Sequence, residues 1–83
     1  MFKLGLMKVK VRLFAGLREE VGIKETEVEL EPGATANSLW RRIVRDKDMP
    51  AGVMTAVNLD YAAPDTSLND GDEVAFFPPV TGG

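Results

Sequence analysis

The sequence predicts a single small α+β domain in which one main helix packs against a sheet. Three observations support this prediction. The chain has 83 residues, which suits one domain with a modest core. Apolar and polar residues alternate in residues 7–13 and 25–30, as in half-buried strands. Apolar residues recur at helical spacing in residues 36–47.

The first strand is predicted over residues 7–14, with its apolar odd-numbered positions facing the core and the basic residues at positions 8, 10 and 12 facing solvent. In residues 1–6 the apolar positions are even-numbered instead. A shift of one residue turns side chains to the opposite face of a sheet. We therefore expect residues 1–6 to be a dispensable extension that precedes the domain.

The next elements follow from local signals. A short helix is predicted over residues 15–21, where Gly22 ends it, and a second strand over residues 25–30, which Pro32 and Gly33 end. Thr35 is a good N-cap for the longer helix, predicted from about residue 36 to 47. Its apolar stripe is expected to be core, and it includes Trp40.

Three strands are expected in the C-terminal half. The third strand is predicted over residues 53–59 with a turn at 58–60, and a short edge strand near Tyr61. A strong turn signal at residues 69–72 leads into a last strand over residues 73–77. The domain is thus expected to end at residue 77, before an extended tail over residues 78–83.

Composition excludes most small-enzyme chemistry. The chain has no cysteine and no histidine, which excludes a thiolate nucleophile, a Ser–His–Asp triad and a His-ligated zinc ion. Residues 48–83 hold six acidic residues and no basic one. This surface disfavours nucleic acid, and fits either a basic protein partner or simple solvation. No run is long and apolar enough to cross a membrane or serve as a targeting signal, so a cytoplasmic protein is expected.

Two charged clusters have plain structural explanations. Asp70, Asp72 and Glu73 lie in a predicted turn, and without histidine or a calcium-loop pattern they make a poor metal site or acid–base pair. The arginines at positions 41, 42 and 45 lie off the apolar stripe of the main helix. They form either a phosphate site or, more commonly, a solvated face.

Two aromatic residues are expected on the outer face of the sheet. Phe14 follows the even, outward positions of its strand, and Phe77 lies opposite to the inward pair Val74 and Phe76. If the core lies under Phe76, both rings point outward together. Exposed aromatic residues that share a face are typical of a protein interface, unless another segment covers them.

The C-terminal tail has an unusual composition. Two prolines, Pro78 and Pro79, stiffen its start, and two glycines, Gly82 and Gly83, end it. The five residues from Pro79 onward reach about 16 Å when extended. Glycines have no Cβ, so they fit a narrow channel and present an unhindered carboxylate. Such a group is suited to activation as an acyl-adenylate.

Residues 70–83, Asp-Gly-Asp-Glu-Val-Ala-Phe-Phe-Pro-Pro-Val-Thr-Gly-Gly, resemble the C-terminus of molybdopterin synthase small subunits, the MoaD-type sulfur carriers. Residues 13–22 resemble the first strand and short helix of that family, and residues 56–58 resemble its third strand. The likeness extends over nearly the whole chain from Met7 onward. Residues 1–6 are the clearest departure from the family pattern.

The resemblance implies a ubiquitin-like β-grasp fold, a mixed sheet with the first and last strands side by side at its centre. It also implies a non-catalytic subunit that carries sulfur. A ubiquitin-activating-like adenylyltransferase would use ATP to adenylate Gly83, and the adenylate would become a thiocarboxylate. The tail would then enter the large catalytic subunit, where the sulfur is used to build the dithiolene of molybdopterin from cyclic pyranopterin monophosphate. This chain would bind no cofactor or metal of its own.

The resemblance also assigns roles to individual residues. Docking to partners is expected to involve Phe14, Arg18, Tyr61 and Phe77, and Arg18 either pairs with an acid of the partner or caps its own helix. The residues expected to guide the terminus are Pro78, Pro79, Val80, Thr81 and Gly82. Alternatives remain: a β-grasp carrier for thiamin or tRNA thiolation, a modifier conjugated to lysines, or a plain interaction module.

Overall fold

The computed structural model describes residues 5–45 and 47–79. The elements, in order, are β1 (Met7–Leu13), α1 (Ala15–Val21), β2 (Glu25–Leu30), α2 (Ala36–Ile43), β3 (Met54–Val57), β4 (Asp60–Ala62) and β5 (Glu73–Phe77). This order confirms the α+β prediction, and it settles the number of strands after the main helix at three within the described ranges.

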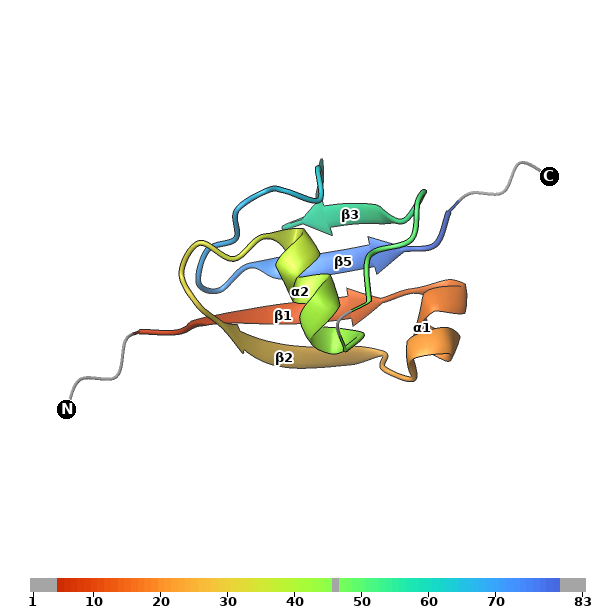
Figure 1. Ribbon diagram of the computed structural model, residues 1–83, viewed down its shortest axis with the longest axis horizontal. Helices are drawn as coiled ribbons and strands as arrows, with labels where there is room; N and C mark the ends of the chain where they lie inside the picture. Colours follow the sequence, from red (N-terminus) through yellow and green to blue (C-terminus); the bar gives the residue numbers. More distant parts are fainter. Residues whose placement is uncertain (1–4, 46, 80–83) are drawn as a thin grey trace.

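The strands form one five-stranded mixed sheet with the order β2-β1-β5-β3-β4. The central strands β1 and β5 are parallel, and the other neighbouring pairs are antiparallel. Helix α2 crosses one face of this sheet (Figure 1). The first and last strands are therefore side by side at the centre, which confirms the β-grasp arrangement.

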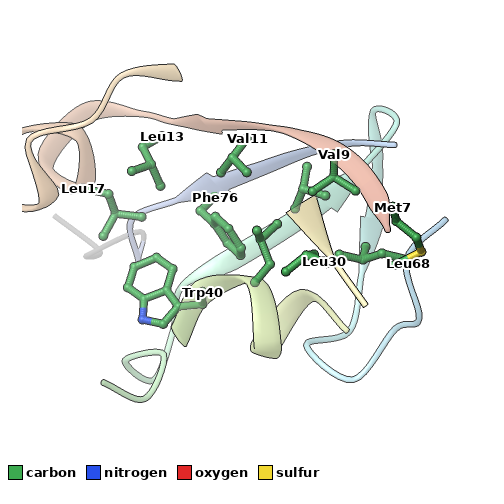
Figure 2. Close-up of a cluster of buried hydrophobic side chains, with 11 residues drawn as sticks. Met7, Val9, Val11, Leu13, Leu17, Leu30, Trp40, Leu68 and Phe76 are labelled. Carbon is green, nitrogen blue, oxygen red and sulfur yellow. The ribbon is translucent and has the colours of Figure 1, made fainter. Parts of the chain in front are cut away.

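The core lies between the sheet and α2. Strand β1 buries each of its odd-numbered residues and exposes each even-numbered one, as its alternation predicts. From β5, Phe76 enters the core and is 0% exposed, and its ring packs edge-on against that of Trp40, with centroids 5.1 Å apart. Figure 2 shows both rings beneath the aliphatic side chains of β1. Trp40 is confirmed as a core residue.

Helix α2 begins where the sequence indicates and ends earlier. The Thr35 side chain accepts a hydrogen bond from the backbone N–H of Ser38, and the Ser38 hydroxyl accepts one from the N–H of Thr35. The helix ends at Ile43 and not near residue 47, because Arg45 adopts a left-handed conformation with φ of 44°. No glycine or proline marks this end in the sequence, and the first breaker is Pro50.

The third strand is also shorter than predicted. Strand β3 pairs with β4 through a two-residue loop, Asn58 and Leu59, and Val57 lies opposite Asp60. Both loop residues have positive φ, as a type I′ turn requires. The turn therefore takes residues 58 and 59 out of the strand predicted to include them.

The acidic turn before β5 has a structural role. The carboxylate of Asp72, only 8% exposed, accepts hydrogen bonds from the Asn58 side-chain amide (2.9 Å) and from the backbone N–H of Asn69 (2.7 Å). Asp70 accepts from the backbone N–H of Lys8 at 2.7 Å. These contacts join the turn to β1 and to the β3–β4 loop, as turn chemistry predicts. Within residues 5–45 and 47–79 there is no cluster of potential metal ligands, and no helix that could span a membrane.

Candidate docking surface and tail

The outer face of the sheet, opposite α2, carries a row of small side chains. Ala75 of β5 lies between Arg12 of β1 and Ala56 of β3, and Ala56 in turn pairs with Tyr61 of β4. Because two alanines fill the middle of this row, the sheet surface is hollow between Arg12 and Tyr61. The row therefore crosses four strands and has larger side chains only at its ends.

Two aromatic rings lie beside this row. Phe14 and Phe77 stack face to face with centroids 4.7 Å apart and an interplanar angle of 10°. The backbone N–H of Phe14 donates to the carbonyl of Phe76 (3.2 Å), which continues the β1–β5 pairing for one residue beyond β1. Both rings are half-buried. The prediction that Phe14 and Phe77 share the outer face is confirmed.

The alanines and aromatic residues enclose a hollow of about 190 Å³. It is lined mainly by apolar side chains, with Arg12 and Glu73 at its polar side. Tyr61 is 75% exposed and Leu59 is 93% exposed, so large apolar side chains stand in solvent around it. We call this area the aromatic patch. Its lining residues are Arg12, Phe14, Ala56, Leu59, Tyr61, Glu73, Ala75 and Phe77.

Leu59 is a residue of this surface that the sequence analysis missed. It has φ of 74°, a conformation that costs a branched side chain about 1–2 kcal/mol and that glycine adopts freely. A leucine side chain that is almost fully exposed, on a strained backbone, does not stabilise the fold. The available signal was the sequence Asn58-Leu59-Asp60 at a turn where Asn-Gly is the common pair.

Residues with positive φ lie on two sides of the aromatic patch. Among the described residues, four that are not glycine have positive φ: Ala15, Arg45, Asn58 and Leu59. Ala15 directly follows Phe14, and Asn58 and Leu59 form the loop at the other side of the patch. Strained conformations of this kind are concentrated at functional sites.

Of the basic residues predicted or found near the patch, Arg12 and Arg18 differ in their surroundings. The Arg12 guanidinium lies 3.2 Å from the Glu73 carboxylate and 3.5 Å from that of Glu25. These are the ion pairs found among the described residues. Arg18 is exposed in α1, near Phe14 at the edge of a separate hollow, and its backbone carbonyl accepts the N–H of Gly22. Its side chain is thus available on the same side as Phe14.

The tail starts at the edge of the aromatic patch. Phe77 is the last residue of β5, and Pro78 and Pro79 continue the chain, Pro78 half-buried and Pro79 exposed. The predicted guiding residues Val80, Thr81 and Gly82, and the predicted reactive residue Gly83, lie outside the described residues. The structure therefore brings together Phe14, Tyr61, Phe77 and the first two residues of the tail.

Larger hollows of about 890 and 670 Å³ lie elsewhere, between β2 and the C-terminal half of α2. Their lining includes exposed arginines at positions 41, 42 and 45, mixed with glutamates such as Glu29. The lining of these depressions is mixed in polarity and in charge, whereas the smaller hollow is mainly apolar and adjoins the tail. The aromatic patch is therefore the better candidate site.

Comparison with known proteins agrees with this geometry. Residues 11–83 match the ThiS family. The chain belongs to that family. The matched residues include the whole aromatic patch and the whole tail, of which the structure does not describe residues 80–83.

Curated relatives of this ThiS-family chain have two kinds of name. It is 42% identical over 81 residues to the molybdopterin synthase sulfur carrier subunit of Escherichia coli, which covers 90% of this chain and 99% of the relative. It is 33% identical over 94 residues to small archaeal modifier protein 3 of Haloferax volcanii, and this alignment covers 93% of this chain and 100% of the relative.

Solved structures of the same size share the fold. The small archaeal modifier protein 1 of H. volcanii superimposes with a TM-score of 0.77 at 26% identity, covering 89% of this chain and 99% of that one. A protein–protein complex of subunits 1 and 2 of the molybdopterin-converting factor from Helicobacter pylori contains a chain that matches with a TM-score of 0.59 at 26% identity, over 93% and 100%. The ubiquitin-like β-grasp fold predicted for this ThiS-family chain is confirmed.

Proposed function

We propose that this chain is the sulfur-carrier subunit of a molybdopterin synthase, with the sulfur held on its C-terminal glycine, Gly83. The observation that carries the proposal is the position of the aromatic patch at the root of a tail that ends in Gly-Gly. A patch of this kind holds the body of the protein on a partner, while the slim tail reaches a reaction centre. The relatives named as sulfur carrier subunits support this assignment.

The chemistry starts at the carboxylate of Gly83. In the adenylyltransferase partner, a carboxylate oxygen attacks the α-phosphorus of ATP, and the bond to pyrophosphate breaks. A hydrosulfide ion then attacks the carbonyl carbon of the acyl-adenylate and displaces AMP, which leaves a thiocarboxylate and releases a proton. Neither step needs an ionisable side chain from the carrier, which agrees with a chain that has no cysteine or histidine.

The carrier then moves to the large catalytic subunit. There two loaded carrier chains supply one sulfur atom each, which together convert cyclic pyranopterin monophosphate into the dithiolene of molybdopterin, and water restores an ordinary carboxylate on each carrier. This chain supplies binding and position and is not the catalyst. The partner supplies the catalytic side chains, and ATP is bound by the activating enzyme. A solved complex that contains subunits 1 and 2 of a molybdopterin-converting factor supports such a partner. We place the protein in the cytoplasm.

The docking contacts assigned to this chain are those of the aromatic patch. Stacking holds Phe14 and Phe77 as one rigid apolar surface, and Tyr61 and Leu59 stand out of the sheet beside it. Exposed aromatic side chains next to an apolar hollow are typical anchors of protein interfaces. Arg18, on the same side as Phe14, is positioned to pair with an acid at the rim of the partner.

The test is mass spectrometry of the C-terminus. The protein is isolated from cells grown with ample sulfur, and a thiol-reactive alkylator is added. Because the chain has no cysteine, the expected label lies on a C-terminal thiocarboxylate. A variant with one residue added after Gly83 is the matched control, and it should fold normally and take up no label. An unlabelled wild-type protein with an oxygen carboxylate would contradict the proposal.

A second candidate is a protein modifier, which the similarity to small archaeal modifier proteins favours. Carriers for thiamin or tRNA thiolation are alternatives within the same chemistry. A modifier forms isopeptide bonds between Gly83 and lysine side chains of other proteins, whereas a dedicated carrier forms none. Tryptic digests of cell extract that contain lysines linked to the C-terminal residues of this chain would favour the modifier.

A further inference from the structure

The loop before β3 lies directly against the start of the tail. In the antiparallel pairing of β3 with β5, Met54 lies opposite Phe77. Two residues further along each chain, the same register places Gly52 opposite Pro79. The structure shows this contact: a Cβ built on Gly52 would lie 3.0 Å from the Cβ of Pro79 and 3.2 Å from its Cγ. The proline ring thus occupies the space that any side chain at position 52 needs.

The pairing of β5 with β3 does not continue into the tail. Prolines have no N–H, so Pro78 and Pro79 cannot donate hydrogen bonds beyond Phe77, and among the described residues no backbone hydrogen bond joins them to the loop before β3. The course of the chain past β5 therefore depends on packing. The ring of Pro79 packs on Gly52.

The loop itself is fixed. The backbone N–H of Val53 donates to the carbonyl of Pro50 (3.3 Å), which closes a turn with Gly52 at its third position and φ of 90°. Met49 and Val53 are partly buried and pack against the core, so the core holds this turn on both sides. Figure 1 shows the loop that precedes β3 beside the end of β5.

We propose that Gly52 is a positioning residue for sulfur carriage: it lets Pro79 lie against the Pro50–Val53 turn, and so fixes the point from which the last four residues extend. This inference rests on the proposed function. Four residues span at most about 14 Å, so the position of Pro79 limits the region that Gly83 can reach. Misplacement of a reacting group by about 1 Å can lower a rate by about a hundredfold.

The test compares two glycines that have the same backbone conformation. Gly52 has φ of 90° and Gly33 has φ of 93°, but a Cβ on Gly33 would meet nothing within 4 Å. Gly52→Ala and Gly33→Ala therefore carry a similar backbone strain, and only the first meets Pro79. We expect both variants to show a similar fall in Tm.

The measured rate is that of ATP-dependent adenylation of the purified chain by its activating enzyme, and the release of pyrophosphate reports this rate. Gly52→Ala should lower kcat about tenfold or more and leave KM unchanged, because the aromatic patch still docks. Gly33→Ala should stay within about twofold of wild type. Equal rates for the two variants would overturn the inference.

Variants of Pro79 give an internal check. Pro79→Gly removes the two side-chain atoms that a new methyl group at position 52 would meet, whereas Pro79→Ala keeps the Cβ at 3.0 Å. Adding Gly52→Ala should therefore lower kcat for adenylation only slightly in the Pro79→Gly background and more strongly in the Pro79→Ala background. The same loss in all backgrounds would show that strain alone is responsible and would overturn the inference.

A spectroscopic measurement on the isolated chain separates this inference from the proposed function. In wild type, an NMR cross-peak between the Gly52 Hα protons and the Pro79 ring is expected, and its absence would overturn the positioning role without reference to any partner. A wild-type chain that shows the cross-peak but is not adenylated would instead contradict the proposed function.

Discussion

Phe76 and Phe77 are consecutive residues of β5 with opposite surroundings. Phe76 faces α2, has no exposed surface and packs against Trp40. Phe77 faces away from α2, is half-buried and stacks on Phe14, next to an apolar hollow. The inner face of the sheet is closed by a helix, whereas the described residues leave the outer face open. The same residue type therefore maintains the fold on one face and is free for binding on the other.

The largest expected effect is on the inner face. Replacing Phe76 by alanine removes a fully buried ring, and we expect a loss of about 3–5 kcal/mol in the free energy of unfolding. Chemical denaturation followed by circular dichroism measures this loss. In a domain of this size such a loss removes most of the stability. A loss below about 1 kcal/mol would show that the two faces do not differ as described.

The corresponding change on the outer face is Phe77→Asp. It places a charge in the aromatic patch and removes the stacked partner of Phe14. We expect binding to the large subunit to weaken by about 2 kcal/mol or more, as for a buried anchor. Isothermal titration calorimetry measures the affinity, and the unfolding free energy should fall by less than about 1.5 kcal/mol, the value of an aromatic pair. Unchanged affinity would remove Phe77 from the interface.

Filling the hollow gives a subtler test of the outer face. Ala75→Phe adds a ring above the alanine row without touching the inner face of β5. We expect about a tenfold loss of affinity for the large subunit, about 1.4 kcal/mol, because the partner loses the space it fills. The melting temperature should change by a few degrees at most. Equal affinity for Ala75→Phe and wild type would show that the hollow stays empty in the complex.

The smallest expected effect is at Leu59. Leu59→Gly creates an Asn-Gly turn, which suits the positive φ values of both loop residues. We expect the protein to gain up to about 1 kcal/mol of stability, which raises Tm by about 4–8 °C, and to bind the large subunit more weakly. Differential scanning calorimetry and a binding titration measure the two effects. A variant that is both less stable and equally tight in binding would refute a docking role for this strained leucine.

The sequence predicted much of the fold because its signals are local. Alternation set the faces of β1 and β2, Thr35 set the start of α2, and the prolines after Phe77 set the end of β5. The end of α2 was not predictable, because Arg45 ends it in a left-handed conformation without a glycine. The central pairing of β1 with β5 was reached through family resemblance, since parallel pairing leaves no local mark.

The candidate site was predicted in part. Each of Phe14 and Phe77 alternates with the inward-facing residues of its own strand, which placed both on the outer face. The structure confirms their contact. The hollow was missed because it depends on which alanines lie opposite each other across strands, a matter of register. Gly52 was missed for the same reason. Its partner Pro79 is 27 residues away along the chain, and only the β3–β5 register brings them together.

The most direct test of the account follows the sulfur atom itself. The chain is prepared with radioactive sulfur in a thiocarboxylate at Gly83 and mixed with the large subunit and cyclic pyranopterin monophosphate, in the absence of ATP and of any other sulfur source. We expect the label to move into the dithiolene product and the chain to be recovered with an oxygen carboxylate. A product that carries no label, or a chain that keeps its label after product has formed, would contradict this expectation.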